Sequence, residues 1–238
     1  MEFLRAVFRG RFHRKYRRAV KALAPYLGKS GVVFDIGGNQ GRFAREFARF
    51  ENGACRVHLF EPFADNLKLC AVNLQSSKNA TIHPFALSNQ NAAIDMIIPL
   101  TTDGGDDSAT PYIEGQAGHA GAGPKGGGTR KIRIECRRLD DMMNSESLPV
   151  PTFIKIDVEG HATKVLRGAK ATIEKHLPNM LIEISKPMET RGDGDARWIV
   201  DYLKDLGYRA WFFDIKAGEM TRVDFGIALK DADILFAR

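Results

Sequence analysis

The segment VVFDIGGNQG, residues 32–41, puts an acid and three glycines directly after a short apolar run rich in β-branched residues. Such a run predicts a buried strand. Glycines at the end of a first strand, followed by a helical pattern, are typical of a sheet that brings its backbone close to a nucleotide at its carboxyl edge. The segment therefore predicts an α/β fold with a nucleotide-binding bend formed by Gly37, Gly38 and Gly41.

The spacing of these glycines and the acid before them bear on the class of ligand. The glycines are spaced GGxxG, and Asn39 stands where a dinucleotide-binding GxGxxG loop has its second glycine. A carboxylate at Asp35 would repel a pyrophosphate in a partly desolvated site and would attract a cation. The segment therefore favours the sulfonium compound S-adenosylmethionine over a nicotinamide dinucleotide, and argues against an oxidoreductase.

Glu61 closes the second expected strand, in the motif LFEPF. A carboxylate at this strand end can accept hydrogen bonds from both hydroxyls of a ribose. The acid suits either class of ligand, so Glu61 supports a nucleoside without choosing between S-adenosylmethionine and a dinucleotide.

Beyond Gly31 the chain alternates short β-rich runs with helical patterns, which is typical of βαβ units on a mainly parallel sheet. We expect a three-layer α/β sandwich with helical segments near residues 41–50, 64–75, 161–177 and 195–207. The expected strands are residues 32–36, 56–60, 80–85, 152–157, 179–184 and 208–213, with a closing pair within residues 225–237.

The first 30 residues are expected to form a basic, amphipathic helical segment in front of one domain, residues 31–238. Residues 1–21 hold eight basic residues and one acid, a net charge of +7, so the +6 of the whole chain leaves −1 for the remainder. Such a helix either packs its apolar stripe on the domain or lies on an anionic membrane surface or another polyanion. The near-neutral body argues against nucleic acid as the main partner.

Cysteine usage and the chain start bear on the compartment. The three cysteines are widely spaced and lack a CxxC pair, which argues against a disulfide framework or a zinc site. Basic residues interrupt every apolar run near the start, so neither a signal peptide nor a spanning helix of about 20 apolar residues is expected. We expect a cytoplasmic protein, with peripheral contact at the inner face of the membrane as an alternative.

A glycine-rich insertion at residues 101–130 breaks the βα rhythm. It holds nine of the 23 glycines, has no periodicity and contains few apolar residues. Long segments of this kind inside a domain are lids or disordered insertions, and the sequence leaves both alternatives open.

Six motifs in order, VFDIGGNQG, LFEP, HPFALSN, RRLDD, FIKIDVEGHATKVLRGA and LIEIS, resemble the FkbM family of S-adenosylmethionine-dependent methyltransferases. The match runs from Val32 to Ser185, and KIDVEGH followed by VLRGA is its most specific part. The resemblance implies a Rossmann-like class I methyltransferase fold with a mostly parallel seven-stranded sheet. It also implies methyl transfer to a hydroxyl of a sugar, glycan or secondary metabolite. Ala162 departs from the family, which commonly has an acid after the histidine.

The same resemblance implies a set of cofactor-binding residues. Glu61 would hold the ribose. That Asp157 faces the methyl donor is our own hypothesis and is not part of the resemblance. The residues on the methionine side would be Asp35, Gly37, Gly38, Asn39 and Gly41, and those beside the adenine would be Phe63, Ala86 and Leu87.

Catalytic candidates gather at the carboxyl ends of two adjacent expected strands. Asp157 and Glu159 follow one strand, His161 begins the next helix, and Glu183 ends the following strand. Transfer to a hydroxyl needs alignment and a group that removes the proton. Our hypothesis is that His161 is the general base and that Glu183 orients it or the acceptor.

Two alternatives remain open for this region. The three acids Asp157, Glu159 and Glu183 could instead hold a divalent cation that binds the acceptor oxygen, a reading that the sequence favours less. The whole chain could also be a non-catalytic nucleoside-binding module whose basic arm holds RNA or a membrane.

Overall fold

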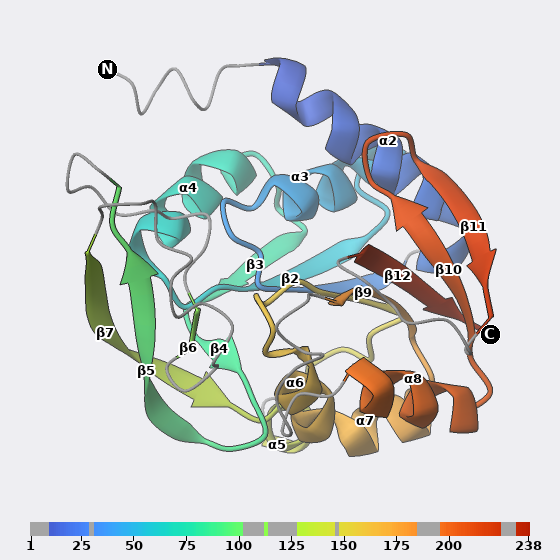
Figure 1. Ribbon diagram of the computed structural model, residues 1–238. Helices are drawn as coiled ribbons and strands as arrows, with labels where there is room; N and C mark the ends of the chain where they lie inside the picture. Colours follow the sequence, from blue (N-terminus) through green and yellow to red (C-terminus); the bar gives the residue numbers. More distant parts are fainter. Residues whose placement is uncertain are drawn as a thin grey trace.

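A computed structural model describes residues 10–28, 31–101, 112–113, 128–145, 148–184, 196–224 and 232–238, with side chains from residue 14 onward except those of 112–113. Within these residues the centre is an eight-stranded sheet of order β11-β10-β12-β9-β8-β1-β2-β3 (Figure 1). Its strands are β1 (Val32–Ile36), β2 (Arg56–Phe60), β3 (Ala80–His83), β8 (Phe153–Ile156), β9 (Asn179–Ile184), β10 (Arg209–Asp214), β11 (Glu219–Val223) and β12 (Ala232–Ala237).

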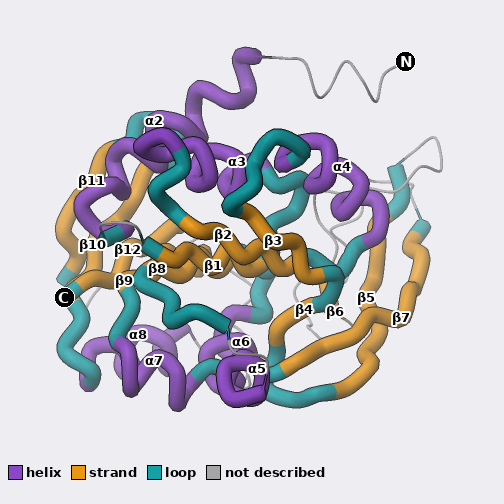
Figure 2. The backbone as a smooth tube through the Cα atoms, turned by 180° about the vertical axis from the view of Figure 1, so that it is seen from behind, coloured by secondary structure: helices purple, strands orange, loops and turns teal. Residues whose placement is uncertain are grey.

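Helices cover both faces of this sheet, so the expected three-layer sandwich is confirmed (Figure 2). One face carries α2 (Gly10–Leu27), α3 (Arg42–Arg49) and α4 (Ala64–Leu74), with a short 3-10 turn at Phe50–Asn52. The other face carries α5 (Leu139–Ser145), α6 (Ala162–Gly168), α7 (Lys170–His176) and α8 (Ala196–Asp205). Successive apolar residues of the central strands point to opposite faces of the sheet. They belong to two separate buried clusters, one on each face.

The parallel half of the sheet matches the expected strands closely. β8, β1, β2 and β3 pair in parallel, as does β8 with β9, whereas β9, β12, β10 and β11 pair antiparallel. The sheet of the described residues has eight strands, one more than the seven that the resemblance implies, and β11 was not among the expected strands. Its sequence EMTRV is largely polar and exposed at the sheet edge, so it carries no apolar signal. Of the expected closing pair, β12 is present, and residues 225–231 lie outside the described residues.

A second sheet of four strands, order β4-β7-β5-β6, was not expected from the sequence. Its strands are β4 (Ala86–Leu87), β5 (Ala92–Pro99), β6 (Tyr112–Ile113) and β7 (Thr129–Arg137). It stands beside the β3 edge of the main sheet and has its own buried cluster, which includes Phe63, Met96 and Ile134 (Figure 2). The glycine-rich insertion connects β5 to β7. Apart from Thr101, β6 and residues 128–130, it lies outside the described residues.

α2 packs its apolar stripe on the domain. Ala19, Val20, Leu23 and Leu27 are buried in the cluster that α3 and the sheet share. Arg18 donates a hydrogen bond to the backbone oxygen of Lys216, 2.9 Å away in the turn after β10. The apolar stripe in the described part of α2 is therefore covered by the rest of the domain. None of the described helices combines the length and apolar character needed to cross a membrane.

Candidate active site

Two cavities meet at the carboxyl edge of the main sheet. The smaller, about 280 Å³, is lined by Ile36, Glu61, Ala86, Leu87, Glu159 and His161 among others. The larger, about 800 Å³, lies between α2, the start of α3, the end of β10 and the start of β12. Gly37, Asn39 and Asp157 line both cavities, so the bend after β1 and the end of β8 form their junction.

The glycine bend is required first by the protein's own packing. Gly37 has a φ of 76°, and a methyl group there would overlap the carbonyl oxygen of Asp157. A methyl group on Gly38 would overlap the side chain of Leu59 in β2. Gly37 lines both cavities and Gly38 only the larger one, whereas Gly41 is not among the residues that line either. Gly37 and Gly38 therefore allow neighbouring segments of the chain itself to pack closely against the bend.

Asp35 does not reach either cavity. It is fully buried, and its Oδ1 lies 3.7 Å from Nζ of Lys155, the residue opposite it in the β1–β8 register. Burial raises the pKa of Asp35, and the attraction of Lys155 offsets only part of that shift. The cation beside the Asp35 carboxylate is therefore Lys155. This buried position of Asp35 differs from the place on the methionine side that the resemblance implies.

Glu61 is held at the smaller cavity by the backbone around it. Its Oε2 accepts a hydrogen bond from the backbone nitrogen of Asn39 at 2.8 Å, and its Oε1 accepts one from that of Phe63 at 2.9 Å. Burial raises the pKa of Glu61 to about 7 against the lowering effect of these bonds. Glu61 thereby fixes the bend after β1 to the end of β2. The Phe63 side chain packs into the second sheet and is not among the residues that line the cavities.

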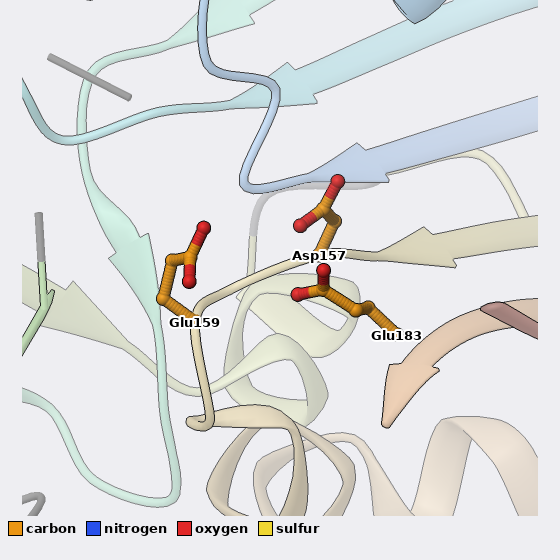
Figure 3. Close-up of side chains that lie close together, drawn as sticks. All are labelled: Asp157, Glu159 and Glu183. Atoms are coloured by element: carbon orange, nitrogen blue, oxygen red, sulfur yellow. The ribbon is translucent and has the colours of Figure 1, made fainter. Parts of the chain in front are cut away.

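The three acids expected to cluster do converge. One carboxylate oxygen from each of Asp157, Glu159 and Glu183 lies within 4.8 Å of the others, and Figure 3 shows the three groups turned toward a common space. Glu159 has a φ of 48°, in a turn that leads into α6. All three residues line the smaller cavity.

Asp157 and Glu183 share one proton. Burial raises the pKa of Glu183 to about 9, and repulsion from Asp157 adds to this effect. Burial would also raise the pKa of Asp157, but Lys155, whose Nζ lies 2.9 Å from its Oδ2, together with a hydrogen bond from Glu183, lowers it. At neutral pH a protonated Glu183 therefore donates to an ionised Asp157, which Lys155 holds from the other side.

His161 lies at the wall of the smaller cavity, at the start of α6. Its Nε2 is 2.9 Å from Oγ of Ser88, and its side chain is buried. Burial lowers the pKa of His161 to about 3, so the ring is neutral at physiological pH. The structure thus brings His161 to the cavity of the acid pair, in a setting that makes protonation of the ring costly.

Several residues around the cavities carry no role in the sequence analysis. Lys155 could have been found, because a lysine in the middle of the buried strand FIKI needs a charged partner. Met96 and Ile134 line the smaller cavity from the second sheet and could not be found without it.

A family model described as the methyltransferase FkbM domain matches residues 35–210. The chain belongs to this family of methyltransferases. The matched span contains all the residues that line the smaller cavity. Lys15 and Tyr16, together with Phe212 and the lining residues that follow it, bring segments outside the span to the larger cavity.

Two kinds of similarity agree with the FkbM assignment. The chain is 28% identical over 149 residues to the 2-O-methyltransferase NoeI of Sinorhizobium fredii, an alignment that covers 60% of this chain and 59% of that relative. The chain thus spans less than two thirds of the relative's length.

Among solved structures, the methyltransferase FkbM of Methylobacillus flagellatus aligns with a TM-score of 0.54 at 18% identity, over 87% of this chain and 43% of that one. The fibrillarin of Aeropyrum pernix, solved with natively bound S-adenosyl-L-methionine, aligns with a TM-score of 0.50 at 11% identity, over 95% and 76%. The Rossmann-like class I methyltransferase fold is therefore confirmed.

Proposed function

We propose that the protein is an S-adenosylmethionine-dependent O-methyltransferase acting on a hydroxyl of a sugar, glycan or secondary metabolite. The observation that carries the proposal is the lining of the smaller cavity. It includes Glu61, a carboxylate that can bind a ribose, together with the acid pair of Asp157 and Glu183. A 2-O-methyltransferase among the relatives supports oxygen as the methylated atom.

The residues of the smaller cavity fit S-adenosylmethionine. Glu61 offers carboxylate lone pairs to the ribose hydroxyls, in addition to those that hold Asn39 and Phe63. Ala86, Leu87 and Met96 give an apolar wall for a purine ring. Gly37 and Asn39 continue toward the junction with the larger cavity, where the methionine part would lie beside Asp157.

The donor supplies a methyl group on a positively charged sulfur, so that a carbon–oxygen bond forms as the sulfur–carbon bond breaks and its electron pair returns to sulfur. The chain's residues align the acceptor hydroxyl and remove its proton. We assign the proton to the Asp157 carboxylate, which Lys155 and Glu183 hold in place. Accepting it there leaves both carboxyl groups neutral, and the buried pair needs no further counter-charge.

From the sequence alone, the proton is assigned to His161 instead. Basicity does not separate the two groups, because the pKa is lowered for both His161 and Asp157. Position separates them, because Asp157 lines both cavities, whereas His161 lines only the smaller one and its Nε2 already faces the Ser88 hydroxyl. We therefore propose His161 as a positioning residue for the loop that carries Asp157 and Glu159. Replacing His161 with glutamine should lower turnover less than Asp157→Asn, and equal loss in both variants would restore the histidine as the base.

The acids at the junction also fit a divalent cation. Asp157, Glu159 and Glu183 supply the oxygen ligands that Mg²⁺ and Ca²⁺ prefer, within a suitable mutual distance. A cation there would lower the pKa of the acceptor hydroxyl. Chelation before assay separates the two readings: activity unaffected by chelator supports the proton-sharing pair, and loss that added Mg²⁺ restores supports the metal.

A methyl-transfer assay tests the proposal as a whole. The full chain is incubated with S-adenosylmethionine and a panel of saccharides and hydroxylated metabolites, and products are read by mass spectrometry. A gain of one methyl group on oxygen in at least one acceptor is expected. Binding of S-adenosylmethionine without any transfer would support the non-catalytic nucleoside-binding alternative.

A further inference from the structure

The larger cavity draws its walls from parts of the chain that the smaller one does not use. Lys15 and Tyr16 come from α2, and Asp214 and Asp233 come from the C-terminal strands, all outside the residues that match the FkbM model. The cavity meets the smaller one at Asp157 and at the bend after β1. It therefore opens onto the point where the proposed methyl group would lie.

A continuous series of contacts links α2 to Asp157. Nζ of Lys15 lies 4.7 Å from the ring centre of Tyr16, and the Tyr16 ring meets Phe43 edge-on at 4.9 Å between centroids. Nζ of Lys155 lies 4.9 Å from the ring centre of Phe43 and 2.9 Å from Oδ2 of Asp157. The helix wall and the junction thus form one packed unit.

The acids near the junction lie on one face of the sheet. Asp233 is opposite Glu183 in the β9–β12 register, so the two side chains point to the same side. Asp233 lines the larger cavity and Glu183 the smaller one. The side chain of Asp157 is 34% exposed between them, whereas that of Lys155 is only 3% exposed.

We propose that the larger cavity is the acceptor site and that it takes a saccharide, bound by the aromatic wall of Tyr16 and by the carboxylate of Asp233. This inference rests on the proposed methyltransferase function. Sugars present apolar C–H faces that pack on aromatic rings and hydroxyls that donate to carboxylates, and this cavity offers both groups beside Asp157. A large polyanion is disfavoured, because acids lie among the basic residues of the lining.

The assignment makes α2 part of the active site and gives acceptor choice to residues outside the matched span. Tyr16→Ala and Asp233→Asn should each raise the KM for the saccharide, roughly tenfold for a lost aromatic or charged contact. The dissociation constant for S-adenosylmethionine should stay within about twofold, because neither residue lines the smaller cavity. Arg14→Ala, an exposed change on the same helix and away from both cavities, is the matched control.

The experiment measures saccharide KM, kcat and donor affinity for these variants and for Tyr16→Phe, with thermal melting as a check of folding. Tyr16→Phe keeps the ring and should keep a KM close to that of the wild type. If Asp233→Asn and a folded Tyr16→Ala match Arg14→Ala in saccharide KM, the acceptor-site assignment is wrong while the methyltransferase proposal stands. If the wild-type protein methylates no saccharide at all, the saccharide assignment fails together with the carbohydrate reading of the proposed function.

Discussion

The two cavities at the sheet edge differ in where their walls come from. The smaller is built from the ends of β1, β2, β8 and β9 together with the second sheet, all within the FkbM match. The larger borrows α2 and the C-terminal strands from outside it. On the proposed assignment, the segments within the FkbM match carry the donor chemistry, and flanking segments of this chain shape the space for the acceptor.

The largest effect is expected at Lys155, which serves the junction between the cavities. Lys155→Met leaves the fully buried Asp35 and the partly exposed Asp157 without their shared cation, and loss of one partner of a buried ion pair costs about 3–5 kcal/mol. Urea denaturation should register this loss. Adding Asp35→Asn to Lys155→Met should recover part of it, because the uncompensated carboxylate is removed. No recovery in the double variant would contradict the pairing.

Next in size is the effect of filling the bend that both cavities share. Gly37→Ala combines a positive φ with an overlap on Asp157, and we expect it to lose at least about 3 kcal/mol of folding stability. Gly128→Ala, where an added methyl group meets only a side-chain carbon of Leu100 at 3.6 Å, is the control. Similar melting temperatures for the two variants would mean that the bend is not held by this packing.

Asp157→Asn should separate chemistry from binding at the junction. The amide cannot take the acceptor proton, so we expect kcat to fall roughly a hundredfold or more. Donor affinity should change far less, because Glu61 and the apolar wall remain. A variant with wild-type kcat would remove Asp157 from the mechanism.

A smaller effect is expected from pH, and His161 carries it at the smaller cavity. The pKa of His161 is about 3 in the folded protein, against an ordinary value of 6.5, so its contribution to stability is complete above pH 6.5 and is lost as the pH falls toward 3. His161→Gln should therefore flatten the loss of stability between pH 6.5 and 4. His58, whose pKa burial lowers to about 4, lines neither cavity and serves as a comparison in His58→Gln. An unchanged slope in His161→Gln would contradict a buried neutral ring.

The sequence predicted the framework well where burial leaves a strong apolar signal. β1, β2 and β9 have the expected bounds because VVFDI, RVHLF and NMLIEI are buried on both faces of the sheet. β7 was missed although KIRIEC within it alternates charged and apolar residues, the pattern of a half-buried strand, directly after the glycine-rich insertion. Because β7 and β5 were missed, Ile134 and Met96, which form one wall of the smaller cavity, were missed as well.

The convergence of three acids could be predicted from the sequence, whereas the ion pair of Asp35 could not. Asp157, Glu159 and Glu183 converge as strand order requires. The partner of Asp35 could not be identified, because the register of β1 and β8 joins residues that lie far apart in the sequence. Asp35, which the sequence alone suggests as a ligand-binding group, is therefore one half of an internal ion pair with Lys155.

The most direct test of the account is calorimetric titration of the full chain with S-adenosylmethionine and, separately, with NAD. We predict that S-adenosylmethionine binds at one site, that NAD does not bind, and that Glu61→Gln weakens binding by at least about tenfold through the lost carboxylate. Binding of NAD alone, or unchanged donor affinity in a folded Glu61→Gln variant, would contradict the assignment of the smaller cavity to the methyl donor.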